Sequence, residues 1–446
     1  MKKDIIILLI AFISLSVFQK SKANDHAGDS INTPGISKVF ALEEYQEDYK
    51  KMVKLLVNKH PQPYAFISED SFKKLTDIQY NKITESTTLG EFLWICQKVT
   101  AAINCGHTWL WANEINNLPN PMVFPMNVRY VGSRLYIIDA KDNSDQLSAG
   151  DEILTINGVK VETLKEEIFN HLPSDGFIES SKHEFTNRLF RPYFAMYFNF
   201  PTSYAVTVHK NGKAEEIKLK VVEKIEPTKS FLDDCKDQLC FDTDEKSNTA
   251  IITIRSFAFY RKKLPVFKSF IDSCFQQIND SKIENLIIDL RNNGGGDPFC
   301  GTHLIQYIAN KPYTYFHKDV WINPSLKKTI HPNSNRFKNK PYILTNGFCT
   351  STTGHFSSIV KENNFGIFVG DETGATYTCN DNSKFFTLKN TKLSFRVPRN
   401  TYYTSASTLT NKHGIIPDHP IIPDIGHILN NTDVVLDYTL KLIEQK

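Results

Sequence analysis

The sequence predicts an α/β protein of several domains whose C-terminal half forms the main sheet. With 446 residues, the chain is longer than the roughly 100 to 200 residues of a typical compact domain, so two or three domains are expected. After residue 248, short apolar runs alternate with stretches of helical periodicity. This alternation is typical of βαβ units in a parallel sheet. In such a sheet, functional residues are expected where strands end and helices begin.

The first 23 residues have the pattern of an export signal. Lys2 and Lys3 give it a positive start, residues 5–17 form an apolar stretch, and residues 21–23 read Ser-Lys-Ala, which is typical of a cleavage site. A membrane anchor is the alternative, but the apolar stretch is shorter than the about 20 residues that span a bilayer core. We therefore expect a signal peptide over 1–23, cleaved near Ala23, and a mature bacterial protein in the periplasm or outside the cell.

Three patterns divide the rest of the chain before the main sheet. Apolar residues recur at helical spacing from residue 42 to residue 105, and strand-like segments follow up to residue 223. The next stretch is charged and polar and has no periodicity. The predicted domains are an N-terminal helical domain over 24–118, a β-rich domain over 119–225, a connecting loop over 226–247 and a core over 248–446.

Within the core, the expected elements alternate along the chain. Each strand is a short apolar run, and each helix has apolar residues three or four positions apart. We expect strands at 250–254, 286–290, 341–345 and 366–369, and helices near 264–278, 301–308 and 354–363.

Composition narrows the kinds of partner and cofactor. The chain has 41% hydrophobic residues and a net charge of +3 with dispersed basic residues, so we expect an ordinary globular protein and no nucleic-acid partner. No Cys-x-x-Cys, Cys/His or HExxH spacing indicates a metal site, and no cofactor is expected. Among the 8 cysteines, Cys235 and Cys240 are the expected disulfide pair.

The first chemical motif is a glycine-rich turn after the strand expected at 286–290. Residues 291–297 read Arg-Asn-Asn-Gly-Gly-Gly-Asp. Glycines in such a turn let the backbone approach a ligand closely, and N–H groups near a helix start favour negative charge. The turn can therefore form half of an oxyanion hole, the set of donors that binds the anionic oxygen of a tetrahedral intermediate. A flexible connection without chemistry is the alternative interpretation.

The second motif is a cluster of hydroxyl side chains between the strand expected at 341–345 and the helix expected at 354–363. Ser351 would lie at the helix N-terminus, where unpaired N–H groups stabilise a developing alkoxide, and it is therefore a candidate nucleophile. A simple N-cap is the alternative role for this serine. The neighbouring hydroxyls that compete with it are Thr350, Thr352 and Thr353.

A serine nucleophile needs a base, and His107 has the most suggestive setting of the 13 histidines, at the end of the helical domain. His355 is nearer in sequence, but four residues after Ser351 it would point along the helix rather than across a substrate site. For any one histidine, an ordinary surface or core position is the alternative interpretation.

Taken together, these motifs resemble peptidase family S41, the C-terminal processing and tricorn-core group, over nearly the whole mature length. The resemblance implies a crotonase-like, ClpP-like α/β core. It also implies that Ser351 is the nucleophile and that the backbone N–H groups of Thr352 and of Gly295 or Gly296 bind the oxyanion. The matching segments are 287–296, 350–352, 369–374 and 414–418.

The β-rich domain is similar to a PDZ domain in the segment 150–159, Gly-Asp-Glu-Ile-Leu-Thr-Ile-Asn-Gly-Val. A PDZ domain binds an extended peptide as an added strand, often at its C-terminal carboxylate. The chain has no Gly-Leu-Gly-Phe-like carboxylate loop. The resemblance therefore implies an inserted PDZ-like domain that helps to bind a peptide or protein substrate.

The resemblance also indicates which residue is the base. Members with a Ser/Lys dyad carry a lysine in the turn after 370–374, where Thr376 and its neighbours stand here. Tricorn-like members take a histidine from the helical domain, which makes His107 the expected base. In those members an acidic residue before the segment matched by 414–418 completes the relay. Asn411 is the expected orienting partner here, since an amide can fix the tautomer of a base.

The expected activity is that of an exported serine endopeptidase that hydrolyses peptide bonds through an acyl-enzyme. Two other hypotheses stay open: a catalytically inactive protein that binds a peptide or a hydrophobic ligand on the same fold, and an esterase-type acyl hydrolase. No membrane span is expected after signal cleavage, and the sequence leaves the oligomeric state open.

Overall fold

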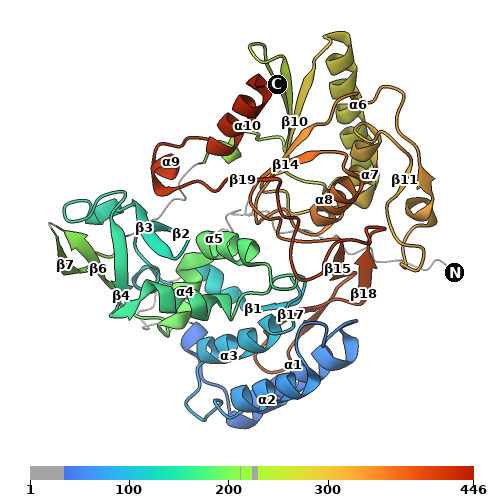
Figure 1. Ribbon diagram of the computed structural model, residues 1–446. Coiled ribbons are helices and arrows are strands. Elements are labelled where there is room, and N and C mark those ends of the chain that lie inside the picture. Colours follow the sequence, from blue (N-terminus) through green and yellow to red (C-terminus); the bar gives the residue numbers. More distant parts are fainter. Residues whose placement is uncertain (1–34, 211, 223–229, 446) are drawn as a thin grey trace, which may run out of the picture. The chain divides into compact units, whose positions relative to one another are not determined.

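The computed structural model describes residues 35–210, 212–222 and 230–445 (Figure 1). The signal peptide predicted over 1–23 lies outside the described residues. Within the described residues, no helix combines the length and the apolar character needed to cross a membrane.

A six-stranded sheet forms the C-terminal core (Figure 1). Its strands are β8 (Leu239–Asp244), β9 (Thr249–Ile254), β10 (Asn285–Asp289), β13 (Tyr342–Thr345), β14 (Ile367–Gly370) and β19 (His419–Pro420). The spatial order is β19-β14-β13-β10-β9-β8, and all neighbours are parallel except β8 and β9. In the register of the sheet, Ile288 lies between Ile252 and Ile343. The predicted parallel sheet is therefore confirmed.

Helices cover both faces of this sheet. They are α6 (Leu264–Asp280), α7 (Pro298–Gln306), α8 (Thr352–Asn363) and α10 (Val434–Glu444), with the short α9 (Ile425–Leu429) before the last. Consecutive strand residues point to opposite faces. Ile288 belongs to the apolar core that includes α6, α7 and α8, whereas Ile287 packs with α10. The predicted core helices are confirmed, with ends shifted by a few residues.

The N-terminal region is helical, as predicted. Its helices are α1 (Leu42–Lys59), α2 (Glu69–Tyr80) and α3 (Leu89–Ala101). The start of α3 shows why the chain turns into a helix there. The Thr88 hydroxyl accepts the Glu91 N–H at 3.2 Å, and the Glu91 carboxylate accepts the Thr88 N–H at 2.8 Å. This reciprocal capping satisfies N–H groups that a helix start leaves unpaired.

The β-rich region forms an antiparallel sheet in the order β2-β3-β4-β6-β7, with β5 paired to β4. The strands are β2 (Asn127–Val131), β3 (Arg134–Asp139), β4 (Glu152–Ile156), β5 (Val159–Lys160), β6 (Ala205–Lys210) and β7 (Lys213–Lys218), and the helices are α4 (Val161–Phe169) and α5 (Glu179–Tyr197). The PDZ-like character of this region stays a prediction.

The helical and β-rich regions share one apolar core, although the sequence predicts two separate domains. Phe92 of α3, Ile153 of β4 and Phe194 of α5 all belong to it, together with Phe395 from the C-terminal part of the chain. Phe395 lies in β17 (Ser394–Val397), which pairs with β1 (Trp109–Trp111) and with β16 (Lys384–Thr387). Periodicity in one segment cannot reveal this pairing, because the partner strands are far apart in sequence.

The segment 226–247, predicted to be a connecting loop, contains a strand. This strand, β8, lies at the edge of the main sheet and, among the described strands, pairs with β9 alone. An edge strand buries little of its surface, so its charged residues conceal the strand pattern. The predicted disulfide between Cys235 and Cys240, next to this strand, is confirmed. The other short pairs are β11 (Tyr313–Thr314) with β12 (Thr329–Ile330), and β15 (Thr378–Asp381) with β18 (Asn400–Tyr403).

Candidate active site

Ser351 lies in a tight turn between β13 and α8, with φ 55° and ψ −124°. For a residue other than glycine, such a conformation costs about 1–3 kcal/mol and persists only where the surrounding structure enforces it. Ser351 occupies the N-cap position of α8, yet its side chain caps no backbone N–H. The side chain is buried, with 6% of the residue exposed. The N-cap interpretation therefore does not account for this serine.

The three threonines that compete with Ser351 in the sequence all use their hydroxyl groups as donors. Thr350 donates to the Gly294 carbonyl at 3.2 Å, and Thr352 donates to the Gly296 carbonyl at 2.6 Å. Thr353 donates to the Asn293 side chain at 2.9 Å. Among the described contacts, the Ser351 hydroxyl has no such acceptor, which distinguishes it from its neighbours.

The glycine turn packs directly against Ser351. Gly295 has φ +93° and Gly296 has φ +144°, values that favour glycine. A Cβ atom on Gly295 would lie 2.8 Å from both the Ser351 Cβ and the Thr352 nitrogen, and one on Gly296 would lie 2.2 Å from the Phe257 backbone. Both positions therefore need glycine for this close approach, as expected from the sequence.

The N–H groups of the turn are not equivalent. The Gly295 N–H donates to the Asn293 side-chain oxygen at 2.9 Å, so it is already used. Within the described residues, the N–H groups of Gly296 and Thr352 donate to no protein acceptor. Of the two glycines that the sequence leaves as alternatives, Gly296 therefore keeps the open donor, beside that of Thr352.

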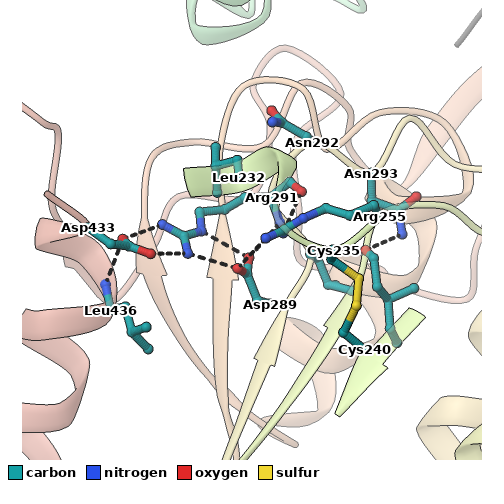
Figure 2. Close-up of polar contacts among 12 residues, drawn as sticks. Leu232, Cys235, Cys240, Arg255, Asp289, Arg291, Asn292, Asn293, Asp433 and Leu436 are labelled. Atoms are coloured by element: carbon teal, nitrogen blue, oxygen red, sulfur yellow. Dashed lines mark hydrogen bonds and ion pairs between the residues drawn. A yellow bond between two sulfur atoms is a disulfide. The ribbon is translucent and has the colours of Figure 1, made fainter. Parts of the chain in front are cut away.

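A buried ion network fixes the start of the glycine turn (Figure 2). Arg291 donates to Asp289 at 2.9 and 2.8 Å and to Asp433 at 2.6 and 2.7 Å. Arg255 donates to Asp289 at 3.0 Å and to the Arg291 carbonyl at 2.9 Å. Burial alone would raise the pKa of Asp289, but the two guanidinium groups hold it well below its usual range. Asp433 also caps α10 through the Leu436 N–H, so the network joins the turn to this helix.

The other two segments that resemble the family meet beside this site. The Gly414 N–H donates to the Glu372 carboxylate, and the Ile415 N–H donates to the Thr373 hydroxyl, both at 2.7 Å. Gly374 packs so closely against the chain before Ser351 that a Cβ atom there would lie 2.1 Å from the Gly347 carbonyl oxygen. The segments 369–374 and 414–418 therefore support the turn that carries the serine.

His107 lies in the turn between α3 and β1 and is buried, with 4% exposed. Its Nε2 is 3.7 Å from the Asp381 carboxylate, at the end of β15. Arg396 donates to the other oxygen of Asp381 at 2.8 Å. Arg396 is also the strand partner of Trp109, two residues after His107. The pairing of β1 with β17 thus brings the imidazole, the carboxylate and the guanidinium together.

Burial favours the neutral form of the His107 ring. Burial lowers the pKa of His107, and the Asp381 carboxylate opposes this shift. Burial would raise the pKa of Asp381, but His107 and Arg396 hold it below its usual range. A neutral imidazole beside a charged carboxylate is the form that a general base requires.

His355, in the first turn of α8, interacts electrostatically with His107. His355 is buried and packs on Phe316 with 5.2 Å between ring centres. Burial, with a smaller effect of His107, lowers the pKa of His355 to about 3. His355 is thus a neutral core residue, and His107 lies near enough to interact with it electrostatically.

The role of Asn411, the predicted orienting partner of His107, stays a prediction. Asn411 lines a neighbouring cavity together with Asp175, and the acidic group beside the ring is Asp381. Asp381, Arg396 and Asp175 are not predicted from the sequence. No local pattern marks them, because they reach His107 only through contacts between segments that are distant in sequence. In the described part of the chain, no group of three or more His, Cys, Asp or Glu side chains is arranged to hold a metal ion.

Comparison with known proteins agrees with this architecture. Residues 248–421 match the sequence model of peptidase family S41. The matched residues include the glycine turn, the Ser351 turn and the two supporting segments. No curated protein has a significantly similar sequence.

Among solved structures, mature CPAF is similar with a TM-score of 0.65 at 14% identity, over 91% of this chain and 97% of that chain. CPAF complexed with lactacystin gives a TM-score of 0.64 at 13% identity, over 91% and 98%. A putative peptidase from Parabacteroides merdae gives 0.50 at 14% identity, over 89% and 96%. At these identities the structural likeness concerns the fold. The match over residues 248–421 and this fold likeness together support a serine-type peptidase of the S41 type.

Proposed function

We propose that the protein is an endopeptidase that uses Ser351 as nucleophile and His107 as general base. The observation that supports this most strongly is the strained backbone of Ser351 between β13 and α8, with its hydroxyl beside the glycine turn and not used as a cap. Backbone strain of this kind is concentrated at functional sites. Peptides or proteins are the substrates that the family implies.

The chemistry follows from the groups around the serine. His107 takes the hydroxyl proton while Ser351 Oγ bonds to the scissile carbonyl carbon, which gives a tetrahedral intermediate. The open N–H groups of Gly296 and Thr352 are suited to bind its oxygen. The intermediate then collapses, the C–N bond breaks, and His107 gives its proton to the leaving amine. Water hydrolyses the resulting acyl-enzyme by the same proton transfers.

In this proposal Asp381 orients the base. Its carboxylate faces Nε2 of His107, so Nδ1 is the nitrogen that takes the proton from Ser351. The transfer needs a hydrogen bond between this nitrogen and the hydroxyl, and such bonds commonly tighten only when substrate is bound. Arg396 keeps Asp381 charged and in position, because it donates to the carboxylate oxygen that does not face the ring.

A fluorophosphonate probe tests the nucleophile. We expect the purified protein to be labelled and to cleave unstructured peptides, and Ser351→Ala to lose both properties. Ser144→Ala, which removes an exposed hydroxyl in the β-rich region, should keep both. A well-folded wild type that is not labelled would contradict the proposal. Labelling with turnover of acyl esters but not of peptides would assign an esterase instead.

We also propose that the protein is exported. The signal pattern over 1–23 supports this, and so does the Cys235–Cys240 disulfide, since disulfides persist mainly in oxidising compartments. Expression of the full chain in bacteria, followed by mass spectrometry of the periplasmic and secreted fractions, should show a mature N-terminus near Asn24. An intact N-terminus in the cytoplasmic fraction alone would contradict export.

A further inference from the structure

A polar cavity of about 170 Å³ lies beside the proposed base. Asn104 and Asp175 form one wall, and Asn380 of β15 forms another. The Asp175 carboxylate accepts the N–H of Gly106, the residue before His107, at 2.8 Å. Asn380 directly precedes Asp381 in β15. The cavity is therefore continuous with the residues that hold His107 and its carboxylate.

The charge in the cavity wall is negative. Asp175 is the acidic residue in its wall, and the wall contains no Lys, Arg or His. One oxygen of Asp175 accepts the Gly106 N–H. Among the described residues, no lysine or arginine forms an ion pair with this carboxylate, although burial raises its pKa and the charges of His107 and Arg396 oppose that shift. A cation that enters the cavity could pair with this buried carboxylate directly.

The rest of the wall suits a group with many hydrogen-bond donors. Gln62, Asn104 and Asn411 line the cavity, and their side-chain amides make no hydrogen bond with any described residue. Tyr377 and Tyr403 also line the cavity. Amide oxygens accept N–H groups, and aromatic faces attract cations. A planar guanidinium, which carries five donors and a positive charge, fits this set better than an apolar or acidic side chain.

We propose that this cavity is the subsite for a basic side chain of the peptide substrate, with Asp175 as its charged partner. The proposal rests on the proposed peptidase function and adds to it the class of peptide that is cleaved. It concerns a side chain close to the scissile bond, because the cavity adjoins the His107 turn.

The first test compares peptides that differ at one position. Fluorogenic peptides with arginine, lysine, citrulline, glutamine, leucine or glutamate at each position flanking the scissile bond are compared by kcat/KM. Citrulline has the shape of arginine without its charge. We expect arginine to exceed citrulline by about 10- to 100-fold at one position, the range for a hydrogen-bonded charge. Equal turnover of arginine and citrulline at every position would overturn the proposal, and a preference for glutamine would assign the cavity to a neutral amide.

A matched pair of variants tests the role of the Asp175 charge. Asp175→Asn keeps an oxygen for the Gly106 N–H but removes the charge, so we expect the ratio of arginine to citrulline turnover to fall to within about threefold of one. Asp142→Asn removes an exposed charge in the β-rich region and should leave the ratio unchanged. If Asp175→Asn does not fold, Asn411→Lys puts a cation in the cavity wall and should reverse the preference toward glutamate. An unchanged ratio in a folded variant would overturn the assignment.

Binding of p-aminobenzamidine, a fluorescent cation, distinguishes a failure of the subsite proposal from a failure of the proposed peptidase function. The Ser351→Ala protein should bind it, and the Ser351→Ala, Asp175→Asn protein should bind at least about tenfold more weakly. Fluorophosphonate labelling of the wild type is measured on the same preparation. Labelling without a preference for basic side chains overturns only the subsite, whereas cation binding without labelling contradicts only the peptidase mechanism.

Discussion

The nucleophile side and the base side of the site are built in different ways. Ser351 and the glycine turn both follow strands of one parallel sheet, and short hydrogen bonds between neighbouring loops hold them together. His107 depends instead on the pairing of β1 with β17 and on Asp381 of β15, which are distant from it in sequence. The first side is thus fixed by local geometry, and the second by long-range assembly. The close packing of neighbouring loops explains the strain at Ser351.

The largest effect is expected from removing the base. His107→Ala should reduce peptide turnover about 100- to 10,000-fold, because general-base assistance contributes that much. His209→Ala, an exposed histidine in β6, should leave turnover unchanged. Initial rates with one fluorogenic peptide measure both. Wild-type turnover by a folded His107→Ala protein would show that His107 is not the general base of Ser351.

The next effect tests the nucleophile side. Gly295→Ala puts a Cβ atom 2.8 Å from the Ser351 Cβ and from the Thr352 nitrogen, so it should displace the oxyanion donors and reduce kcat about 100- to 1000-fold. Gly132→Ala changes a glycine that also has positive φ but has open space around it. The control should keep kcat and lose only stability in urea unfolding. Equal kcat for the two variants would show that the close approach of the glycine turn has no catalytic role.

A smaller effect separates the two candidates for orienting the base. Asp381→Asn should slow fluorophosphonate labelling about 10- to 100-fold, because it removes the charge beside His107. Asn411→Ala should slow labelling less than about threefold, because Asn411 supplies no charge to the ring. The labelling rate is used because it needs no substrate side chain in the cavity. If Asn411→Ala slowed labelling more than Asp381→Asn, Asn411 would be the orienting partner, as the sequence predicts.

The smallest effect is a pair of opposite pH shifts. His107 must be neutral to take a proton, so kcat/KM rises with pH through its pKa. Asp381 raises this pKa and Arg396 lowers it. Asp381→Asn should therefore move the acid limb of the pH profile to lower pH, and Arg396→Gln should move it to higher pH. Shifts in the same direction would show that another group controls the acid limb.

The contrast between local geometry and long-range assembly also determines which features can be predicted from the sequence. Strands and helices of the core follow from local periodicity, and the Ser351 and Gly295 turns follow from strand-to-helix junctions. The sequence does not reveal that Ser351 is strained, because φ depends on the packing of neighbouring loops. Asp381 and Arg396 escape prediction because their roles arise from pairing between distant strands. Asn411, the partner that the sequence predicts for His107, lines the neighbouring cavity.

The most direct test is a crystal structure of the protein after reaction with diisopropyl fluorophosphate. The proposed mechanism predicts a phosphorus atom bonded to Ser351 Oγ and its free oxygen about 2.7–3.1 Å from the N–H groups of Gly296 and Thr352. It also predicts a ring nitrogen of His107 within about 2.6–3.2 Å of an oxygen of the adduct. An unmodified Ser351, or an adduct whose His107 ring stays beyond hydrogen-bond reach, would contradict it.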